Sequence, residues 1–387
     1  MLDQDAQPAE TSKPEDYRQP FSLPKHWYYD RKVYEAEKEG IFGNAWLCAG
    51  HVSEFQKPGD FARIDFCDES VLVVCGADNV IRAMYNVCQH RGHQLVSERR
   101  GNLRKMIRCP YHSWVYGLDG ALRKAAKQES VPGFPVAQLG LPQMKVDFCG
   151  QFVFFNADEN AAPMAEMYPD LGKTMESDLP DLDRATFLEG DSQALPVNWK
   201  SLIDNVVEAY HFALSGPGHK SLAKTVDFDG FYRKKADNWL TYQFPATNEA
   251  ESTPYPVDLK KVRGRKDGFV VFWMYPDTLI FSMTATGVTC MYRMPPTGPE
   301  TMYADSAYYI PDERREDAAT REAIVWMNTI VNAEDYSLSS SSFRGSKSKG
   351  FTRSHLLVNP CNDDSPFSEG PLEMVHRLFH DAADPFL

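Results

Sequence analysis

Residues 198–211, Asn-Trp-Lys-Ser-Leu-Ile-Asp-Asn-Val-Val-Glu-Ala-Tyr-His, decide the fold of the second half of the chain. Their apolar side chains recur at the spacing of one buried face of an α-helix (Trp199, Leu202, Ile203, Val206, Val207 and Tyr210). At about 100° per residue, Asp204, Glu208 and His211 share another strip of this predicted helix, with Asn205 at its edge. A carboxylate one turn before a histidine can orient a metal ligand. A solvated polar face would show the same pattern.

The residues that follow this helix favour a metal site. Ser215-Gly216-Pro217-Gly218 predicts a break in the helix, and His219 comes directly after it. On an unbroken helix, residues eight apart lie about 12 Å apart along the axis, which is too far to share one ion. Because the break lets the chain turn back, we expect His211 and His219 to converge on one metal.

The composition is that of an ordinary globular protein, with 387 residues, 43% hydrophobic and 25% charged. The chain has 41 Lys and Arg against 54 Asp and Glu, and the net charge of −13 argues against nucleic acid or an anionic membrane as its main partner. We find no apolar run near the ~20 residues of a membrane span and no signal-peptide core, so we expect a cytoplasmic protein. The eight cysteines are scattered, unlike a disulfide framework.

The pattern of strands and helices changes along the chain. Residues 1–16 are polar and predict a mobile tail. Between about residues 46 and 156, short strand-like runs separated by turn residues indicate a small all-β domain (Phe61–Phe66, Val71–Cys75, Ile81–Tyr85 and Gln151–Phe155). The rest of the chain mixes strands and helices. We expect a helix between Asp30 and Trp46, strands at Gly268–Met274 and Thr278–Met283, a long helix over Pro311–Leu338 and a loop over Ser337–Ser348.

Two pairs of metal-binding residues lie inside the predicted all-β domain. Cys88-Gln89-His90 and Cys109-Pro110-Tyr111-His112 each combine one thiolate with one imidazole. Zinc accepts Cys₂His₂, but zinc modules more often pair cysteine with cysteine and histidine with histidine. In a Rieske [2Fe–2S] centre, one iron takes both cysteines and the other takes both histidines. The mixed pairs therefore favour a Rieske cluster over zinc.

These motifs resemble those of one enzyme family. Cys88-x-His90-Arg91-Gly92-His93 and Cys109-Pro110-Tyr111-His112-Ser113-Trp114 are similar to the Rieske motif of the ring-hydroxylating, non-haem iron oxygenase α subunits. Asn198-Trp199-Lys200 and Glu208-x-Tyr210-His211 resemble the mononuclear-iron motif of the same family. The resemblance runs from about residue 20 to the last helix. It implies an α+β protein in which an all-β Rieske domain (46–156) is inserted in a catalytic domain (17–45 and 157–387), where helices cover an antiparallel sheet of the helix-grip type.

The resemblance also implies a mononuclear iron with two histidines and one carboxylate, which leave three positions open. His211 and His219 supply the nitrogens, although their separation of eight residues exceeds the usual five of the family. Asp335 falls within an apolar stripe of the predicted long helix (Ile324, Met327, Val331 and Leu338), where a buried acid is costly unless it is paired or bound to metal. Glu334 lies at the edge of this stripe and is the weaker candidate. Alternatively, Asp335 merely ends a helix near the surface.

By the same resemblance, Glu208 bridges His211 to the partner subunit's His112, which requires a ring of subunits and implies a homotrimer. Asn205 matches a polar position near the iron. Electrons from NAD(P)H would arrive through a separate flavin and iron–sulfur reductase, because the chain shows no Gly-x-Gly-x-x-Gly fingerprint.

The implied function is a terminal oxygenase that hydroxylates or oxidatively demethylates a quaternary ammonium compound, an N-methyl compound or an aromatic acid. A ring-cis-dihydroxylating dioxygenase, a Rieske electron carrier without oxygenase activity and a zinc-stabilised binding module are the alternatives. Several aromatic residues are candidates for a pocket wall or a cation cage, although their alternation on a strand also fits plain core (Phe212, Phe269, Phe272, Trp273 and Tyr275).

Overall fold

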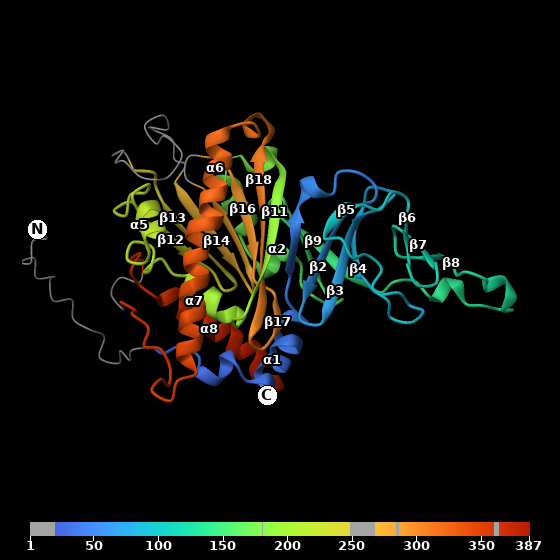
Figure 1. Ribbon diagram of the computed structural model, residues 1–387, viewed down its shortest axis with the longest axis horizontal. Coiled ribbons are helices and arrows are strands. Elements are labelled where there is room, and N and C mark those ends of the chain that lie inside the picture. The colour runs from blue at the N-terminus through green and yellow to red at the C-terminus, as the bar shows by residue number, and fades with distance from the viewer. Residues whose placement is uncertain (1–19, 180, 248–267, 284–285, 360–363) are drawn as a thin grey trace, which may run out of the picture.

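The computed structural model describes residues 20–179, 181–247, 268–283, 286–359 and 364–387. A β-rich part lies at the right of Figure 1, and a larger part, in which helices cover a broad sheet, lies at the left. The tail expected over residues 1–16 and Cys361 fall outside the described residues. Within the described ranges, no helix has both the length and the apolar character needed to cross a membrane.

Short antiparallel strands build the β-rich part, as the sequence predicts. Seven strands form one sheet in the order β1-β10-β9-β4-β3-β2-β5, and β6, β7 and β8 form a second, smaller sheet. One buried core joins the two sheets (Leu72, Val74, Met84, Ile107 and Tyr116). The strands are β1 (Leu47–His51), β2 (Asp60–Phe66), β3 (Glu69–Cys75), β4 (Ile81–Tyr85), β5 (Arg100–Asn102), β6 (Met106–Arg108), β7 (Val115–Gly117), β8 (Leu122–Lys124), β9 (Gln143–Cys149) and β10 (Phe152–Asn156).

The larger part contains a broad antiparallel sheet that is buried on both faces. Its strand order is β11-β18-β16-β15-β14-β13-β12, with β17 paired to β18. In β14, Phe269, Val271 and Trp273 enter one core while Phe272 enters the other, which explains its continuous apolar sequence. The strands are β11 (Ala185–Leu195), β12 (Tyr232–Lys235), β13 (Trp239–Phe244), β14 (Phe269–Met274), β15 (Thr278–Ser282), β16 (Thr289–Arg293), β17 (Pro296–Gly298) and β18 (Thr301–Pro311).

Different elements cover the two faces of this sheet. On one face lie α1 (Arg31–Glu37), α4 (Trp199–Val206), α6 (Ala318–Trp326), α7 (Asn332–Ser346) and α8 (Gly370–Ala383), whose apolar residues share a core with the sheet. On the other face, α2 (Met164–Met167), α3 (Leu171–Asp178) and strand β10 pack against it. The short helix α5 (Pro217–Ala223) lies at the sheet's outer end in Figure 1.

The predicted bounds of the long helix and of the serine-rich loop are wrong. Strand β18 extends to Pro311, and α6 begins only after Asp317, whose side chain caps the helix by accepting from the Ala319 N–H at 3.2 Å. A π-helical turn over Met327–Val331 leads into α7, which continues through the serine-rich segment to Ser346. Serine favours a helix only weakly, but the buried Phe343 holds α7 on the core and outweighs that preference.

The motif Asn198-Trp199-Lys200 has a structural explanation. The Asn198 side chain caps α4 by accepting from the Lys200 N–H at 3.0 Å. Trp199 donates its indole N–H to the Glu37 carboxylate at 3.0 Å. The Lys200 ammonium forms an ion pair with the same carboxylate, and both side chains are buried. These contacts fasten α1 to the helix that leads into the site.

Removing one charge of this ion pair should destabilise the protein strongly. We expect Glu37→Gln to lower the free energy of unfolding by about 3–5 kcal/mol, because it leaves the buried Lys200 ammonium without a counter-charge. The double variant Glu37→Gln/Lys200→Met should recover most of that loss, since no uncompensated charge remains. Urea denaturation followed by tryptophan fluorescence measures both. Equal losses in the single and double variants would contradict this account.

Candidate metal centres

The stretch that begins with α4 folds back on itself before it reaches His211. Helix α4 ends at Val206, so the prediction of one helix through His211 is wrong. The Tyr242 hydroxyl donates to the Val206 carbonyl at 3.2 Å, and the Glu208 carboxylate accepts from the His211 backbone N–H at 3.1 Å. These bonds satisfy a backbone carbonyl and a backbone N–H where the helix ends. The chain can therefore turn away from the helix and bury Ala209 and Phe212 in the core.

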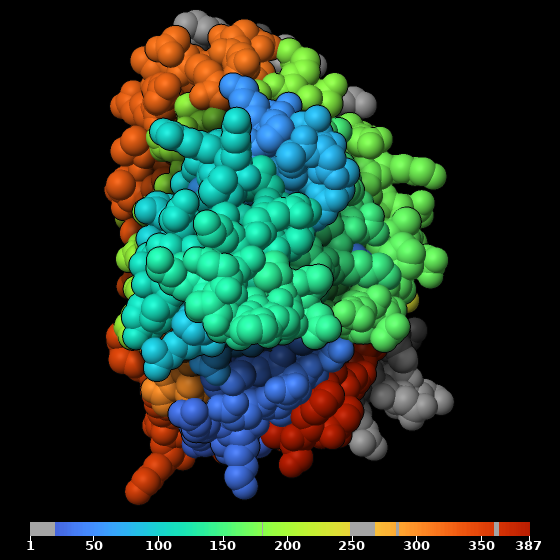
Figure 2. Space-filling model, turned by 90° about the vertical axis from the view of Figure 1, so that its right-hand side faces the viewer, coloured from blue at the N-terminus to red at the C-terminus, as the bar shows by residue number. Residues whose placement is uncertain are grey.

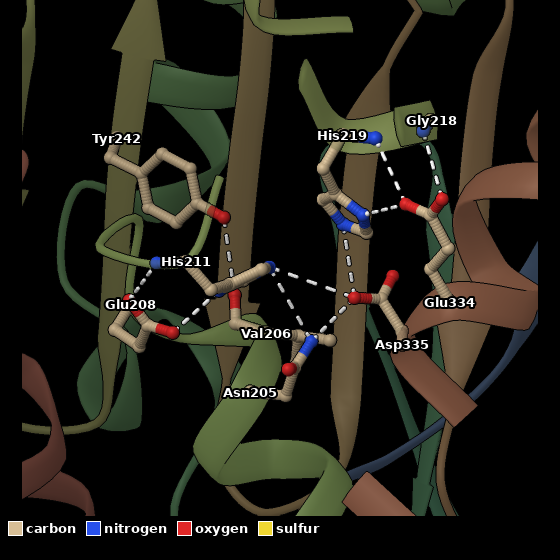
Figure 3. Close-up of polar contacts among 9 residues, drawn as sticks. All are labelled: Asn205, Val206, Glu208, His211, Gly218, His219, Tyr242, Glu334 and Asp335. Atoms are coloured by element: carbon tan, nitrogen blue, oxygen red, sulfur yellow. Dashed lines mark hydrogen bonds and ion pairs between the residues drawn. The ribbon is translucent and has the colours of Figure 1, made fainter. Parts of the chain in front are cut away.

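Glu208 also fixes the His211 side chain, by a contact across the turn instead of along a helix. Its carboxylate lies 2.5 Å from Nδ1 of His211, and this bond assigns the proton to Nδ1 and leaves Nε2 as an acceptor facing Asp335 (Figure 3). Asp204 does not join this group. Its carboxylate accepts from the Tyr28 hydroxyl at 2.7 Å and lies 2.8 Å from Nε2 of His376. Asp204 points away from His211 because it lies on α4, before the point at which the chain reverses.

His219 lies in the first turn of α5, directly after the glycine-proline break. Its Nδ1 lies 2.8 Å from a Glu334 oxygen, and its Nε2 lies 3.0 Å from Oδ1 of Asp335. The backbone N–H groups of Gly218 and His219 donate to the same Glu334 carboxylate at 2.8 and 3.0 Å. A Cβ at position 216 would lie 2.4 Å from the Glu334 carboxyl carbon, so Gly216 permits this close approach.

Glu334 is therefore placed to orient His219, a role that the sequence did not predict. Glu334 and Asp335 are adjacent in the sequence, but their spacing does not predict which side of the helix each carboxylate faces. The π-helical turn before α7 shifts its phase, so that Leu338 is 38% exposed and the stripe expected to include it is wrong. Asp335 nevertheless faces the two histidines.

Three candidate ligands converge between α5 and α7. His211, His219 and Asp335 each offer one ligand atom, and these atoms lie within 4.8 Å of one another. The amide of Asn205 donates to Oδ1 of Asp335 at 2.7 Å and lies 3.5 Å from Nε2 of His211, so every residue of the group has a neighbour that holds its orientation (Figure 3). Two imidazoles and one carboxylate on one side suit Fe(II) with open positions. The residues fit a mononuclear iron.

The carboxylates around the histidines also set their affinity for protons. Burial lowers the pKa of His211, but the Glu208 and Asp335 carboxylates outweigh it and the pKa lies above its usual value. Burial acts likewise on His219, where Asp335 and Glu334 raise the pKa. A metal ion held by these groups would compete with protons for the same nitrogens, so metal binding would release protons.

Two cavities lie beside this group. A small one of about 60 Å³ is lined by all three candidate ligands and by aromatic and aliphatic side chains, among them Phe212, Tyr242, Phe269, Phe281, Tyr292 and Tyr336. Phe212 and Phe269 line it as expected of a pocket wall, whereas Phe272, Trp273 and Tyr275 do not. Phe272 belongs to the core on the opposite face of the sheet because neighbouring strand residues alternate. Asn205 also lines the second cavity, of about 480 Å³, which Glu208 lines as well.

The second candidate centre lies in two loops of the β-rich part, after β4 and after β6. Cys88 and Cys109 are buried. The Gly92 N–H donates to the Cys88 carbonyl at 3.0 Å and the Ser113 N–H to the Cys109 carbonyl at 3.1 Å. Gly92 and Ser113 both have positive φ, 69° and 57°, so the two loops make the same tight turn around the thiols.

The histidines of these loops lie beside each other. The rings of His90 and His112 are 4.6 Å apart between centroids. Nδ1 of His112 is buried and has no hydrogen-bond partner among the described residues, as a nitrogen reserved for a metal would be. The Tyr116 hydroxyl lies 3.3 Å from the Cys88 sulfur, which suits a thiolate ligand. Two thiols and two imidazoles in this arrangement fit a [2Fe–2S] cluster of the Rieske type.

Comparisons with known proteins match both parts of the chain. Residues 45–135 match the model of the Rieske [2Fe-2S] domain family, and residues 173–384 match that of the ring hydroxylating alpha subunit (catalytic domain). The carnitine monooxygenase oxygenase subunit of Escherichia coli (strain K12) is 31% identical over 360 residues, 92% of each chain. The glycine betaine monooxygenase oxygenase subunit of Pseudomonas aeruginosa (strain UCBPP-PA14) is 32% identical over 239 residues, 61% of this chain and 54% of that one.

Solved structures agree with this match. The quaternary ammonium Rieske monooxygenase CntA in complex with L-carnitine superimposes with a TM-score of 0.81 at 28% identity, covering 95% of this chain and 96% of that chain. A naphthalene 1,2-dioxygenase mutant bound to phenanthrene shares the fold, with a TM-score of 0.79 at 18% identity and the same coverage.

Proposed function

Because the chain belongs to the Rieske ring-hydroxylating oxygenase α-subunit family, we propose that it is a terminal oxygenase that hydroxylates or oxidatively demethylates a small quaternary ammonium or N-methyl compound. The family assignment removes the zinc-stabilised module and the pure electron carrier from consideration. For a substrate C–H bond, the balanced reaction consumes O₂, NAD(P)H and one proton and yields the C–OH product, water and NAD(P)⁺. A separate flavin and iron–sulfur reductase delivers the electrons.

Family membership brings an iron–sulfur cluster and a mononuclear iron, and we assign each to residues of this chain. Cys88, His90, Cys109 and His112 would hold the cluster. His211, His219 and Asp335 would hold the mononuclear iron, which when bound supplies the activation of O₂. We also propose the domain division 46–156 for the Rieske domain and 17–45 with 157–387 for the catalytic domain, because β1 to β10 close one set of sheets between residues 47 and 156.

The protein's part in this chemistry is to hold the ligands and shape a dry cavity. The Glu208 and Glu334 carboxylates accept hydrogen bonds from Nδ1 of His211 and His219, which leaves both Nε2 atoms free to hold the iron. Asn205 restrains Asp335. The apolar walls of the small cavity exclude bulk water from the reacting carbon.

We propose that electrons cross between subunits of a homotrimer through Glu208. The loops that carry the cluster residues follow β4 and β6 at one end of Figure 1, whereas α5 and α7, which carry His219 and Asp335, lie at the other. Glu208 contacts His211 and faces the cavity of about 480 Å³, which gives the partner subunit's His112 a route to its carboxylate. A carboxylate shared by two imidazoles provides a short, ordered path.

Glu208→Gln tests this bridge. We expect the variant to retain the visible spectrum of the cluster and its mononuclear iron, and to slow reoxidation of the reduced cluster in a single turnover by about 10–100-fold. Glu369→Gln is the matched control, since Glu369 lines the same cavity without a hydrogen bond to His211 among the described contacts. Stopped-flow absorbance measures both variants. Wild-type rates in Glu208→Gln would remove the bridging role.

The aromatic cavity beside the three candidate ligands is the observation that supports a quaternary ammonium substrate. Aromatic rings attract a cation that carries no hydrogen-bond donor, and no Lys or Arg lies among the described residues that line this cavity. The relatives named for carnitine and glycine betaine favour the same class. Dihydroxylation of an aromatic acid is the second candidate, favoured by the 2-aminobenzenesulfonate 2,3-dioxygenase α subunit of Alcaligenes sp, which is 32% identical over 208 residues, 52% of each chain.

Substrate-dependent oxygen uptake distinguishes the two candidates. The loaded enzyme, NADH and a flavin and iron–sulfur reductase are supplied with carnitine, choline, glycine betaine or benzoate under ¹⁸O₂. We expect N-methylated compounds to stimulate uptake and to yield product with a single ¹⁸O atom before any C–N cleavage. Stimulation by benzoate alone, with both atoms of O₂ in a diol, would overturn the proposed substrate class.

A further inference from the structure

A small cavity of about 10 Å³ lies between the β-rich part and the broad sheet of the larger part. Among its described lining residues are four arginines. Arg63 of β2 and the adjacent Arg99 and Arg100, at the start of β5, come from the β-rich part, and Arg293 of β16 comes from the sheet. Figure 2 views the molecule with the β-rich part, in cyan and blue-green, in front of the larger part. A cavity of this volume holds one small occupant, about the size of a water molecule.

Of the two acids among the described lining residues, only Asp305 points toward the arginines. Asp305 stands in one row of the sheet with Arg293. Asp191 stands in the next row, with Ser306 and Tyr292, and Tyr292 lines the cavity of the candidate iron ligands on the other face of the sheet. Because successive side chains of a strand alternate between the two faces, the Asp191 carboxylate points away from the arginines.

The Asp305 carboxylate is shared between two arginines. Its Oδ1 lies 3.0 Å from Nη1 of Arg99, and its Oδ2 lies 2.9 Å from Nη2 of Arg293. Asp277 is buried near Arg293, but it makes no ion pair with any described residue and is not among the described lining residues; burial raises its pKa to about 6. The guanidinium groups are therefore the nearest charges to the cavity, and the nearest charges dominate its electrostatic potential.

Two of these arginines also have hydrogen-bond donors that no protein atom uses. Nε of Arg63 and Nε of Arg293 are buried and have no hydrogen-bond partner among the described residues. Arg293 is only 5% exposed, so bulk water does not satisfy its N–H group. Arg63 and Arg100 have acidic partners, Asp65 at 3.0 Å and Glu54, but both acids lie outside the lining. A buried donor of a charged group that is left unsatisfied is costly, so these two N–H groups indicate an acceptor in the cavity.

We propose that this cavity binds one small inorganic anion of about the size of chloride, which fastens the β-rich part to the broad sheet. The anion accepts charge-assisted hydrogen bonds from arginines on both sides of the boundary. Its site is complete only when the two parts are docked, so binding stabilises the folded chain. A water molecule would accept from the same donors but would not balance their charge. Arg293 and the candidate iron ligands lie on opposite faces of the sheet, so the anion is a structural ligand that takes no part in turnover.

Anomalous diffraction from bromide identifies the occupant. The probe is sodium bromide, in place of chloride, in crystals of the fully loaded enzyme. We expect an anomalous peak in the cavity between Arg63 and Arg293. In solution, the urea midpoint of unfolding should rise with chloride or bromide, but not with gluconate at the same ionic strength.

The variant Arg63→Met should weaken this halide dependence by about tenfold or more in the concentration required, because it removes a charged donor. Asp65 is partly exposed, so the loss of its partner is tolerated. Arg63→Lys retains a positive charge for Asp65 but lacks the Nε–H group, so it separates the loss of the donor from the loss of the ion pair. We expect it to fold as wild type does and to bind halide more weakly.

Arg82→Met is the matched control, since Arg82 pairs with Asp78 at 2.7 Å in the β-rich part but does not line the cavity. It should keep the wild-type dependence on halide and the bromide peak. Water alone in the cavity would overturn the proposal. Bromide at surface positions only, an adventitious ion only, would overturn it as well. The same conclusion follows if the halide dependence is unchanged in both Arg63 variants.

Discussion

The variant His211→Ala is expected to lose its mononuclear iron and at least about a thousandfold of its turnover while keeping the visible spectrum of the cluster. His211 supplies one of only three candidate ligand atoms, and its Nε2 faces the Asp335 oxygen at 3.6 Å. Without it, a single imidazole and one carboxylate remain, which bind Fe(II) weakly. Within one chain the cluster residues lie in a separate part of the molecule, so the variant leaves all four cluster ligands in place.

Iron analysis, the visible spectrum and substrate-dependent O₂ uptake together measure this outcome. His26→Ala is the control, because His26 is exposed and belongs to neither group of candidate ligands. It should retain all three properties. Loss of both the cluster spectrum and the mononuclear iron in His211→Ala, with the fold preserved by circular dichroism, would contradict two separate centres.

The complementary variant Cys109→Ser should remove the cluster and abolish NADH-driven turnover while leaving the mononuclear iron in place. A hydroxyl at pH 7 is protonated and is a poor replacement for a thiolate that bridges protein and iron. Cys109 is buried, and its backbone carbonyl anchors the loop that carries His112. The variant therefore loses a ligand without an alternative in reach.

Cys75→Ser is the matched control for this variant, since Cys75 is a buried cysteine of strand β3 outside both cluster loops. It should keep the red-brown absorption and most of the activity. Electron paramagnetic resonance of the Fe(II)–nitric oxide adduct reports the mononuclear iron in each variant. A Cys109→Ser protein that still showed a Rieske spectrum would remove this residue from the ligand set.

Local patterns in the sequence predicted most of the residues that the structure brings together. The cysteine–histidine pairs are close in sequence, so tight turns alone bring each pair together, and the alternating strands around them were recognisable. His211 and His219 are likewise separated by a single break. The rule that an acid in an apolar stripe needs a partner predicts Asp335, although the exposed Leu338 does not belong to that stripe.

The errors arose where tertiary contacts override local preference. The side chain of Tyr242, distant in sequence, caps α4 at Val206, so no periodicity in residues 198–211 could show that the helix stops there. The serine-rich segment joins α7 because Phe343 packs on the core. Glu334 acquires its role only when Gly216 and Gly218 allow it to approach His219. Glu334 and His219 lie more than 100 residues apart in the sequence. No local pattern could therefore predict their contact.

Metal and sulfide analysis of fully loaded protein, prepared without oxygen, tests the central claim of two distinct iron centres most directly. The account predicts three irons and two acid-labile sulfides per chain, and chelation should remove one iron without bleaching the cluster. Zinc in place of iron would contradict this expectation. So would two irons per chain, with no third iron that is lost in the His211→Ala variant.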